Sequence, residues 1–295
     1  MRITVLSGKG GVGKSMLASS LAILFSKKFN VIAVDCDVDA PNLALWLGID
    51  NSKKGGAFKS YMISTVEKPI IDEDVCTKCG KCLDACNFGA LSNGKRAVEL
   101  IPYRCEGCGL CEIICPVDAI EMKKVENCTL SHYETEYDFP VVQGQIEPGE
   151  AESGEAVTEI RKYADTLCKK DAVIIQDGAA GIGCPVIASI VGSDYVVAVA
   201  ESSMSSFSDL KRALEVVNQF KIPYGVVVNK YDLNKNISNE IMKFAGDRYL
   251  GGINYHKDVI KSIVDLKPAV EMGGNVRKEL EDIFQNVLES TKGLF

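Results

Sequence analysis

The chain has 295 residues, of which 46% are apolar and 25% charged, so its composition is that of an ordinary globular protein. That length fits one large α/β domain with a small accessory module, or two medium domains. The formal net charge is −7 and the pI is about 5.1, and because phosphate binding needs a basic surface, we expect no nucleic acid among the partners.

Neither a signal peptide nor a membrane span is predicted. The first residues lead directly into a glycine-rich loop, and no apolar run reaches the roughly 20 residues that a bilayer requires. We therefore expect a cytoplasmic protein that binds no membrane. Thiols stay reduced in that compartment, so the twelve cysteines are expected to bind metal rather than to form disulfides.

The first predicted elements are a strand, a glycine-rich loop and a helix. Residues 3–6 form a short apolar run, and residues 16–25 have apolar side chains at helical spacing. The loop between them contains G-x-x-x-x-G-K-[ST], which in this context is a P-loop whose backbone N–H groups bind phosphate. Lys14 is expected to reach the β- and γ-phosphates, and Ser15 to bind Mg²⁺. The predicted nucleotide-binding residues of this segment are Gly8, Lys9, Gly10, Gly11, Val12, Gly13, Lys14, Ser15 and Met16.

Lys9 adds a second lysine early in the loop. The string K-G-G-x-G-K-[ST] resembles the deviant Walker A motif of the MinD/ParA/nitrogenase-iron-protein superfamily of P-loop ATPases. In that superfamily the early lysine reaches across a dimer interface to the nucleotide of the partner subunit. The resemblance therefore implies a nucleotide-sandwich dimer, either a homodimer or a heterodimer with a related ATPase.

An acidic loop follows the next predicted strand, which covers residues 31–34. Its D-x-D pattern, Asp35 and Asp37, resembles switch I of the same superfamily. The resemblance implies that Asp35 lies on the magnesium side, and that Asp37 positions the attacking water next to the metal. Phosphoryl transfer depends mainly on positioning and charge neutralisation, so short acidic loops suffice. With the two lysines, Asp37 completes the predicted catalytic set of Lys9, Lys14 and Asp37.

Two cysteine runs follow, each with the spacing C-x2-C-x2-C-x3-C that is typical of bacterial ferredoxins. In such pairs of runs, the fourth cysteine binds the cluster of the other run. One [4Fe–4S] cluster is therefore expected on Cys76, Cys79, Cys82 and Cys115, and a second on Cys86, Cys105, Cys108 and Cys111. Zinc sites use paired C-x2-C elements, which would leave the third and fourth cysteines of each run without a role.

These runs divide the chain. We predict an inserted ferredoxin domain at 67–124, between two parts of the ATPase domain at 1–66 and 125–295. An insert of this size buries too little apolar surface to be stable without metal, so loss of iron should unfold it. After it, residues 143–155 are rich in glycine and acidic side chains and are predicted to form a loop, followed by a helix over 156–167.

A third apolar strand, at 173–176, is followed by the pattern D-x-x-x-G, which resembles Walker B and switch II. Asp177 would bind Mg²⁺, so that the predicted magnesium set is Ser15, Asp35, Asp37 and Asp177. The backbone N–H of Gly181 would sense the γ-phosphate. Asn229 and Lys230 follow a later strand where this superfamily contacts the base. The string also matches the guanine-reading N-K-x-D, but similar strings in relatives that use ATP favour ATP.

Four cysteines lie outside the two runs. Cys36, Cys128 and Cys168 are expected to be small buried apolar residues. Cys184 lies seven residues after Asp177, which is the offset of a cluster-binding cysteine in the nitrogenase iron protein. The stretch 146–158, where that family has its other such cysteine, contains none here. Two interpretations of Cys184 stay open, namely a labile metal or redox site, and simple packing.

The C-terminal segment 276–288 is predicted to be an amphipathic helix. Its polar face carries both acidic and basic residues, whereas a membrane-binding helix would be predominantly basic. We expect it to pack on the sheet.

The predicted fold is α/β, a doubly wound and mostly parallel sheet with an inserted α+β ferredoxin-like module. The predicted function couples an ATP-switched dimer to electron transfer through two [4Fe–4S] clusters, with a redox or metallocluster protein as partner. Two alternatives remain open: an ATPase for iron–sulfur or metallocluster assembly or delivery, and a positioning or scaffold ATPase with structural clusters.

Overall fold

The computed structural model describes residues 1–50, 58–150 and 154–294, and these ranges contain one large sheet of nine strands and a small one of two. The order in the large sheet is β11-β10-β9-β1-β8-β2-β7-β6-β3, with all pairs parallel except β7–β6 and β6–β3. The strands are β1 (Arg2–Ser7), β2 (Val31–Asp35), β3 (Lys59–Ile71), β6 (Ile120–Glu134), β7 (Pro140–Ile146), β8 (Val173–Ala180), β9 (Tyr195–Glu201), β10 (Tyr224–Asn229) and β11 (Tyr249–Ile253).

Helices cover both faces of this sheet, so its central strands are apolar on both sides. One face packs against α1 (Lys14–Ser26), α2 (Leu43–Trp46), α9 (Lys257–Val264), η3 (Ala269–Glu271) and α10 (Gly274–Thr291). The other packs against α5 (Gly154–Thr166), α6 (Cys184–Ile190), α7 (Met204–Gln219) and α8 (Lys235–Ala245). The remaining short helices of this body are η2 (Gly246–Arg248) and η4 (Lys292–Leu294). The doubly wound, mostly parallel α/β fold predicted from the sequence is confirmed.

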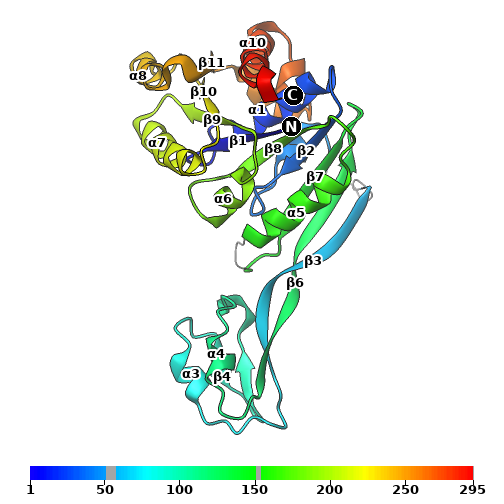
Figure 1. Ribbon diagram of the computed structural model, residues 1–295, viewed down its shortest axis with the longest axis vertical. Helices are drawn as coiled ribbons and strands as arrows, with labels where there is room; N and C mark the ends of the chain where they lie inside the picture. Colours follow the sequence, from blue (N-terminus) through cyan, green and yellow to red (C-terminus); the bar gives the residue numbers. More distant parts are fainter. Residues whose placement is uncertain (51–57, 151–153, 295) are drawn as a thin grey trace.

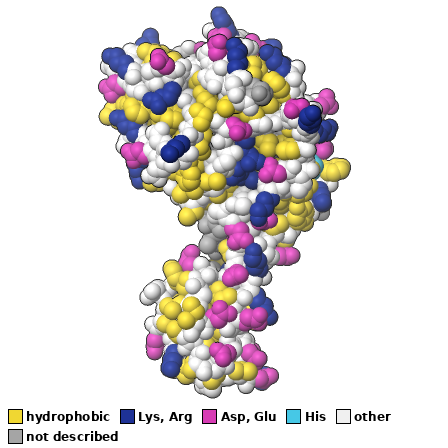
Figure 2. Space-filling view, in the orientation of Figure 1, with side chains coloured by type: hydrophobic (Ala, Val, Ile, Leu, Met, Phe, Trp, Pro, Cys, Tyr) yellow, Lys and Arg dark blue, Asp and Glu magenta, His cyan; other side chains and the backbone are white. Residues whose placement is uncertain are grey.

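A long antiparallel ribbon, made of β3 and β6, leaves the sheet at one edge and carries a small module at its far end (Figure 1). The module contains α3 (Lys81–Ala85), β4 (Leu91–Asn93), β5 (Val98–Leu100), η1 (Pro102–Arg104) and α4 (Leu110–Ile113). In the space-filling view, a narrow neck joins it to the body (Figure 2). The predicted domain boundaries near residues 66 and 124 lie inside β3 and β6, so the ribbon runs through both.

The loop predicted at residues 143–155 is wrong in its first part, because 143–146 belong to β7. Gln143 and Gly144 are residue types that favour loops, so the sequence did not indicate a strand here, but both lie in β7 under α5. A side chain at Gly144 would meet Ile160 at 2.2 Å, so only glycine lets the helix approach this closely. Residues 151–153 of the predicted loop lie outside the described residues. The following helix, α5, agrees with the prediction to within two residues.

The C-terminal helix packs as expected. Residues Val276, Leu280, Ile283, Phe284 and Val287 of α10 are buried, and Phe284 meets Phe25 of α1 edge to face at 4.9 Å. Among the described residues, no helix is long and apolar enough to cross a membrane.

Candidate functional site

The phosphate loop lies at the carboxyl end of β1, where ligands of open α/β sheets bind. Gly13 precedes α1 with φ at +95°, a conformation that other residues avoid. A side chain there would also come within 2.2 Å of the Asn229 amide, which donates to the Val12 carbonyl at 2.8 Å. The fold therefore brings Asn229, predicted to contact the base, onto the phosphate loop from the end of β10.

Lys14 reaches two of the predicted carboxylates. Its ammonium group is 2.7 Å from Asp177 Oδ1 and 3.6 Å from Asp37 Oδ2. Burial acts to lower the pKa of Lys14, but the negative charges of Asp177, Asp35 and Asp37 raise it, so the lysine stays protonated. The other oxygen of Asp177, Oδ2, is buried and has no hydrogen-bond partner in the described part of the chain. A buried acceptor without a partner is costly unless a ligand satisfies it.

Asp35 has a different environment from the other two carboxylates. It is fully buried, and its oxygens accept hydrogen bonds from the backbone N–H groups of Asp37, Asn42 and Leu43 at 2.8–3.0 Å. Burial and the charge of Asp177 raise its pKa to about 7. Asp35 thus fixes the conformation of the loop that follows β2. The site as a whole has three carboxylates, namely Asp35, Asp37 and Asp177, near a single buried lysine. Mg²⁺ is usually bound by one or two carboxylates together with phosphate oxygens and water, so these residues fit the predicted ion although, among the described residues, no three such side chains converge on one point.

Lys9 is held by a residue that the sequence analysis missed. Its ammonium group donates to Glu201 Oε1 at 2.6 Å and to Ser205 at 3.3 Å, while Lys230 donates to Glu201 Oε2 at 2.8 Å. Burial acts to raise the pKa of Glu201, but hydrogen bonds from Lys230 and Lys9 lower it to about 2. Glu201 ends β9, and a carboxylate at the carboxyl end of a central strand was the signal that could have revealed it.

Gly181 lies beside the phosphate loop, with φ at +100° and its N–H bonded to the carbonyl of Ser7 at 3.0 Å. To contact a γ-phosphate, this N–H must break its hydrogen bond to Ser7.

The other predicted phosphate-loop residues lie beside it. Ser15 and Met16 are in the first turn of α1, and a Cβ atom added at Gly10 or Gly11 would have no described atom within 4 Å. The predicted nucleotide-binding and magnesium residues therefore gather at one edge of the sheet.

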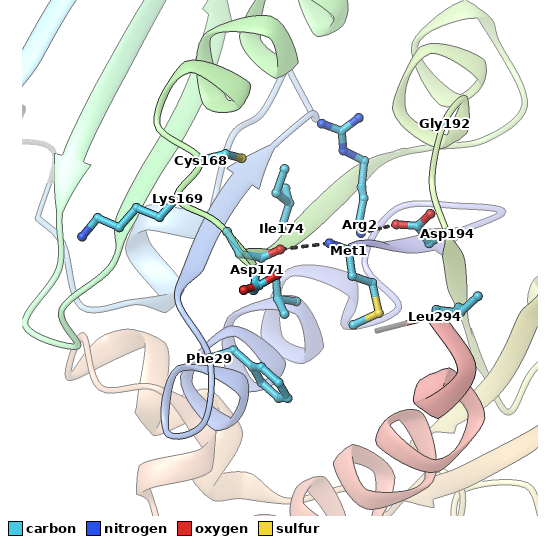
Figure 3. A pocket seen from close by; sticks show the side chains of 12 residues that line it. Met1, Arg2, Phe29, Cys168, Lys169, Asp171, Ile174, Gly192, Asp194 and Leu294 are labelled. Carbon is cyan, nitrogen blue, oxygen red and sulfur yellow. Dashed lines mark hydrogen bonds between the residues drawn. The ribbon is translucent and has the colours of Figure 1, made fainter.

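A separate groove lies at the opposite edge, near the start of β1 and β8 (Figure 3). Two of its polar groups bond to neighbouring residues, because the Met1 ammonium group donates to the Ala172 carbonyl and the Arg2 backbone N–H donates to Asp194. It is remote from the carboxyl ends of the strands, so it is not the nucleotide site.

Eight cysteines line two cavities in the module. One cavity is lined by Cys86, Cys105, Cys108 and Cys111, and the other by Cys76, Cys79, Cys82 and Cys115. Each cavity therefore receives three cysteines from one run and the last cysteine of the other run, as the sequence analysis expects. Within the described ranges, no three His, Cys, Asp or Glu side chains gather closely enough to hold a single metal ion.

The backbone around the two cavities repeats. Gly80 and Gly109, one residue after the second cysteine of each run, both have positive φ and precede a short helix. The fourth cysteines accept similar hydrogen bonds, from Ala90 N–H to Cys86 Sγ at 3.3 Å and from Ala119 N–H to Cys115 Sγ at 3.2 Å. Thiolates bound to iron–sulfur clusters are stabilised by such bonds, so the donor set fits a cluster in each cavity.

The remaining cysteines divide by exposure. Cys36 and Cys128 are buried, as predicted, whereas Cys168 is exposed at the end of α5, so its predicted burial is wrong. Helix α5 ends two residues earlier, and the chain turns outward before β8. Cys184 is exposed at the first position of α6, just beyond the switch II segment.

A doubly wound sheet with a phosphate loop, a buried lysine and acidic loops at its carboxyl edge defines a P-loop nucleotide-binding protein. The family model described as "CobQ/CobB/MinD/ParA nucleotide binding domain" matches residues 3–269. The chain belongs to this family. An uncharacterized protein of Methanocaldococcus jannaschii is 36% identical over 98% of this chain and 97% of its own length. A ferredoxin of Pyrobaculum islandicum is 39% identical over 20% of this chain and 55% of its own.

Solved structures support the same fold at low sequence identity. The septum site-determining protein MinD of Pyrococcus horikoshii, complexed with Mg-ADP, has a TM-score of 0.56 and 16% identity, covering 97% of this chain and 95% of that one. A chain of the MinC:MinD cell division protein complex of Aquifex aeolicus has a TM-score of 0.58 and 16% identity, covering 98% of this chain and 95% of that one. These similarities concern the fold; the ligand and the partner belong to those proteins.

Proposed function

We propose that this protein is a Mg²⁺-dependent ATPase that couples nucleotide binding and hydrolysis to electron transfer through two iron–sulfur clusters. The observation that carries the proposal is that the nucleotide-binding sheet continues, strand by strand, into the cysteine-rich module. The strands β3 and β6 belong to the nucleotide-binding sheet and also hold the cysteine-lined cavities. A change at the carboxyl edge of the sheet therefore has a continuous path to the module through paired strands.

The proposed ATPase activity is supported by the charges around Lys14, which lies near Asp177 and Asp37. When Mg·ATP binds, Lys14 would exchange Asp177 for phosphate oxygens, and Ser15, Asp35 and Asp177 would hold the metal ion. Asp37, which is partly exposed and near Lys14, orients the attacking water. Breaking the β–γ phosphoanhydride bond gives ADP and inorganic phosphate, and no covalent enzyme intermediate is needed.

The proposed nucleotide-dependent dimer is supported by the position of Lys9. In the single chain this lysine is bound to Glu201, on the same face as the phosphate loop. Release from Glu201 would free it to reach the nucleotide of a second subunit, either another copy or a related ATPase. Closure of that dimer is the step that we assign to ATP binding, and hydrolysis reverses it.

The redox part rests on the cysteines. The last cysteine of each run crosses to the other cavity, which ties the two halves of the module together. A cluster in such a cavity supplies one-electron transfer at a potential set by its surroundings. The chain's own role is to exclude water with Leu91, Val98 and Ile120 and to donate backbone hydrogen bonds to sulfur.

A second candidate function is delivery of iron–sulfur or other metal clusters to a recipient protein. One observation favours it: Cys184 is exposed and adjacent to switch II, where nucleotide hydrolysis would change its accessibility. Clusters bound by four cysteines each in the two cavities would stay bound, so a labile cargo would need Cys184.

The test is an anaerobic redox titration followed by EPR, with and without Mg·ATP, on protein whose iron has been counted. We expect about eight irons per chain and a shift in potential or line shape when ATP is added. Lys14→Ala should retain the iron and lose the shift. EPR signals that do not change when ATP is added to the wild-type protein would contradict coupled electron transfer. Cluster-transfer assays that compare wild type with Cys184→Ala would then test delivery.

A further inference from the structure

Helix α5 contacts both the switch II region and the ribbon that carries the module. It packs beside α6, which begins directly after the switch II segment, and it also covers part of β7 and β3. In Figure 1 the helix lies across the sheet between α6 and the start of the ribbon. The same helix therefore links the nucleotide edge to the module.

Arg161, in the middle of α5, makes the contacts on the switch II side. Its guanidinium group donates to the carbonyl oxygens of Ala188 and Val191 at the end of α6. Its Nε donates to the side-chain oxygen of Gln176 at 3.0 Å. Carbonyls at a helix C-terminus carry partial negative charge and have no partner within the helix, so an arginine satisfies both needs.

Gln176 connects this contact to the magnesium carboxylate. Successive side chains of a strand point to opposite faces of the sheet. Asp177 accordingly faces Lys14 and the phosphate loop, whereas Gln176 faces α5 and α6. Gln176 is fully buried, and its amide donates to Thr4 and to the carbonyl of Ser189, both at 2.7 Å. A shift of β8 at Asp177 must therefore move the groups that Arg161 binds.

The opposite side of α5 is attached to the ribbon. The Tyr163 ring meets Tyr61 of β3 at 5.9 Å, and its hydroxyl is 3.2 Å from His132 Nδ1 of β6. Nearer the module, Lys124 of β6 donates to Glu155 in the first turn of α5 at 2.7 Å. Movement of α5 is thus transmitted to both strands of the ribbon.

We propose that Arg161 is a positioning residue that transmits the nucleotide state of switch II, through α5, to the ribbon and the ferredoxin-like module. The inference rests on the proposed function, because it names the route of its coupling. Arg161 lies on the Gln176 side of the sheet, away from the phosphate loop and outside the two cysteine-lined cavities, so its substitution should separate ATP hydrolysis from the response of the module.

The geometry explains why this residue is an arginine. The planar guanidinium group donates in three directions at once, to two carbonyls of α6 and to Gln176. A lysine keeps the charge and part of the packing but cannot hold all three acceptors. Arg161→Lys is therefore the informative variant, since it weakens the link without leaving a large cavity.

The experiment compares wild type, Arg161→Lys and a matched control, Lys162→Gln, on the holoprotein. Lys162 is the next residue of α5, is exposed and pairs with Glu159 on the same helix. Hydrogen exchange of β3 and β6 is measured with and without the non-hydrolysable analogue Mg·AMPPNP, beside the EPR signal and ATP turnover. A second variant, Tyr163→Phe, removes the hydroxyl contact to His132 at the ribbon end.

We expect the nucleotide-induced change in exchange to fall by about 2- to 30-fold in Arg161→Lys, the range that coupling residues span. Iron content and ATP turnover should stay near wild type, and Lys162→Gln should match wild type throughout. Tyr163→Phe should give a smaller loss. The inference is overturned if Arg161→Lys keeps the full response, or if the wild-type ribbon does not respond to nucleotide. A ribbon that responds while the EPR signal does not would contradict the electron-transfer function and leave the Arg161 route supported.

Discussion

Burial separates the cysteines that lie outside the two cavities. Cys36 follows β2 and is fully buried, which raises the pKa of its thiol to about 12. Burial likewise raises the pKa of Cys128 to about 11. A thiol reacts as the thiolate, so both should be inert near neutral pH. Cys168 and Cys184 are exposed. They are the two cysteines that reagents can reach and that do not line either cavity.

We predict that iodoacetamide at pH 8 alkylates Cys184 and Cys168 in the anaerobic holoprotein and leaves Cys36 and Cys128 unmodified, as measured by peptide mass spectrometry. With a pKa of about 12, roughly one Cys36 in 10⁴ is ionised at that pH. Raising the pH toward the pKa increases the thiolate fraction, so labelling of Cys36 should rise if the fold persists. Labelling of Cys36 as fast as Cys184 at pH 8 would contradict the buried position of its thiol.

Sequence motifs gave most of the nucleotide-site residues but not Glu201. The P-loop and the two acidic loops have fixed patterns because phosphate and Mg²⁺ require particular groups at particular spacing. Glu201 binds Lys9 and Lys230 from a strand nearly 200 residues after Lys9. No local pattern marks such a residue, since its role depends on the carboxyl ends of β1 and β9 lying side by side.

Among the elements, the described residues of the ribbon make two ion pairs with the body, one buried and one exposed, beside the β6–β7 pairing and the contacts of Tyr163. Lys68 of β3 lies 2.5 Å from Glu150 and donates to the Pro102 carbonyl of the module, and both charged side chains are mostly buried. The Tyr103 ring also packs against Gly149. The loop after β7 therefore contacts the module directly, next to the run that begins at Cys105.

We predict that Lys68→Met lowers the free energy of local opening of the ribbon by about 3–5 kcal/mol, because it leaves the Glu150 carboxylate buried and unpaired. Hydrogen exchange of β3 and β6 measures this opening. The matched variant Lys124→Met breaks the exposed pair with Glu155 and should change the same rates little. Equal effects of the two variants would contradict the assignment of Lys68 as the main attachment.

The helices and the central strands were predicted correctly, whereas the two ribbon strands were not predicted. The apolar faces of α5 and α10 follow the helical period, which the sequence carries locally. Few residues of β3 are buried, and the buried ones do not alternate with exposed ones, so the strand lacks the alternation that marks a half-buried strand. The pairing of the two ribbon strands across about 60 residues is visible only in the register of β3 against β6.

At the scale of the whole molecule, the two parts differ in what stabilises them. The body has large apolar clusters on both faces of its sheet. The module's own cluster contains Cys82, Leu91, Val98 and Ile120, with several more cysteines packed at its margin. So small an apolar cluster cannot offset the ordering of about 50 residues, so bound iron is expected to hold the module together.

We predict that removing iron with a chelator under anaerobic, reducing conditions unfolds the module and leaves the body folded. Hydrogen exchange should become fast over residues 72–119 and remain slow in β1 and β8. Nucleotide binding, measured by calorimetry, should survive. Slow exchange of the module after complete loss of iron would contradict this account, as would melting of the body together with the module.

Short patterns in the sequence identify the phosphate loop, the acidic loops and the ferredoxin-like spacing of eight cysteines, and the succession of strands and helices predicts the doubly wound sheet. These patterns are local, so the sequence shows them without the fold. The way in which the parts are joined is visible in the three-dimensional structure alone: β3 and β6 continue the nucleotide-binding sheet, Glu201 holds Lys9, and Arg161 binds the end of α6. Those contacts join residues far apart in the chain, and long-range packing leaves no local pattern in a single sequence.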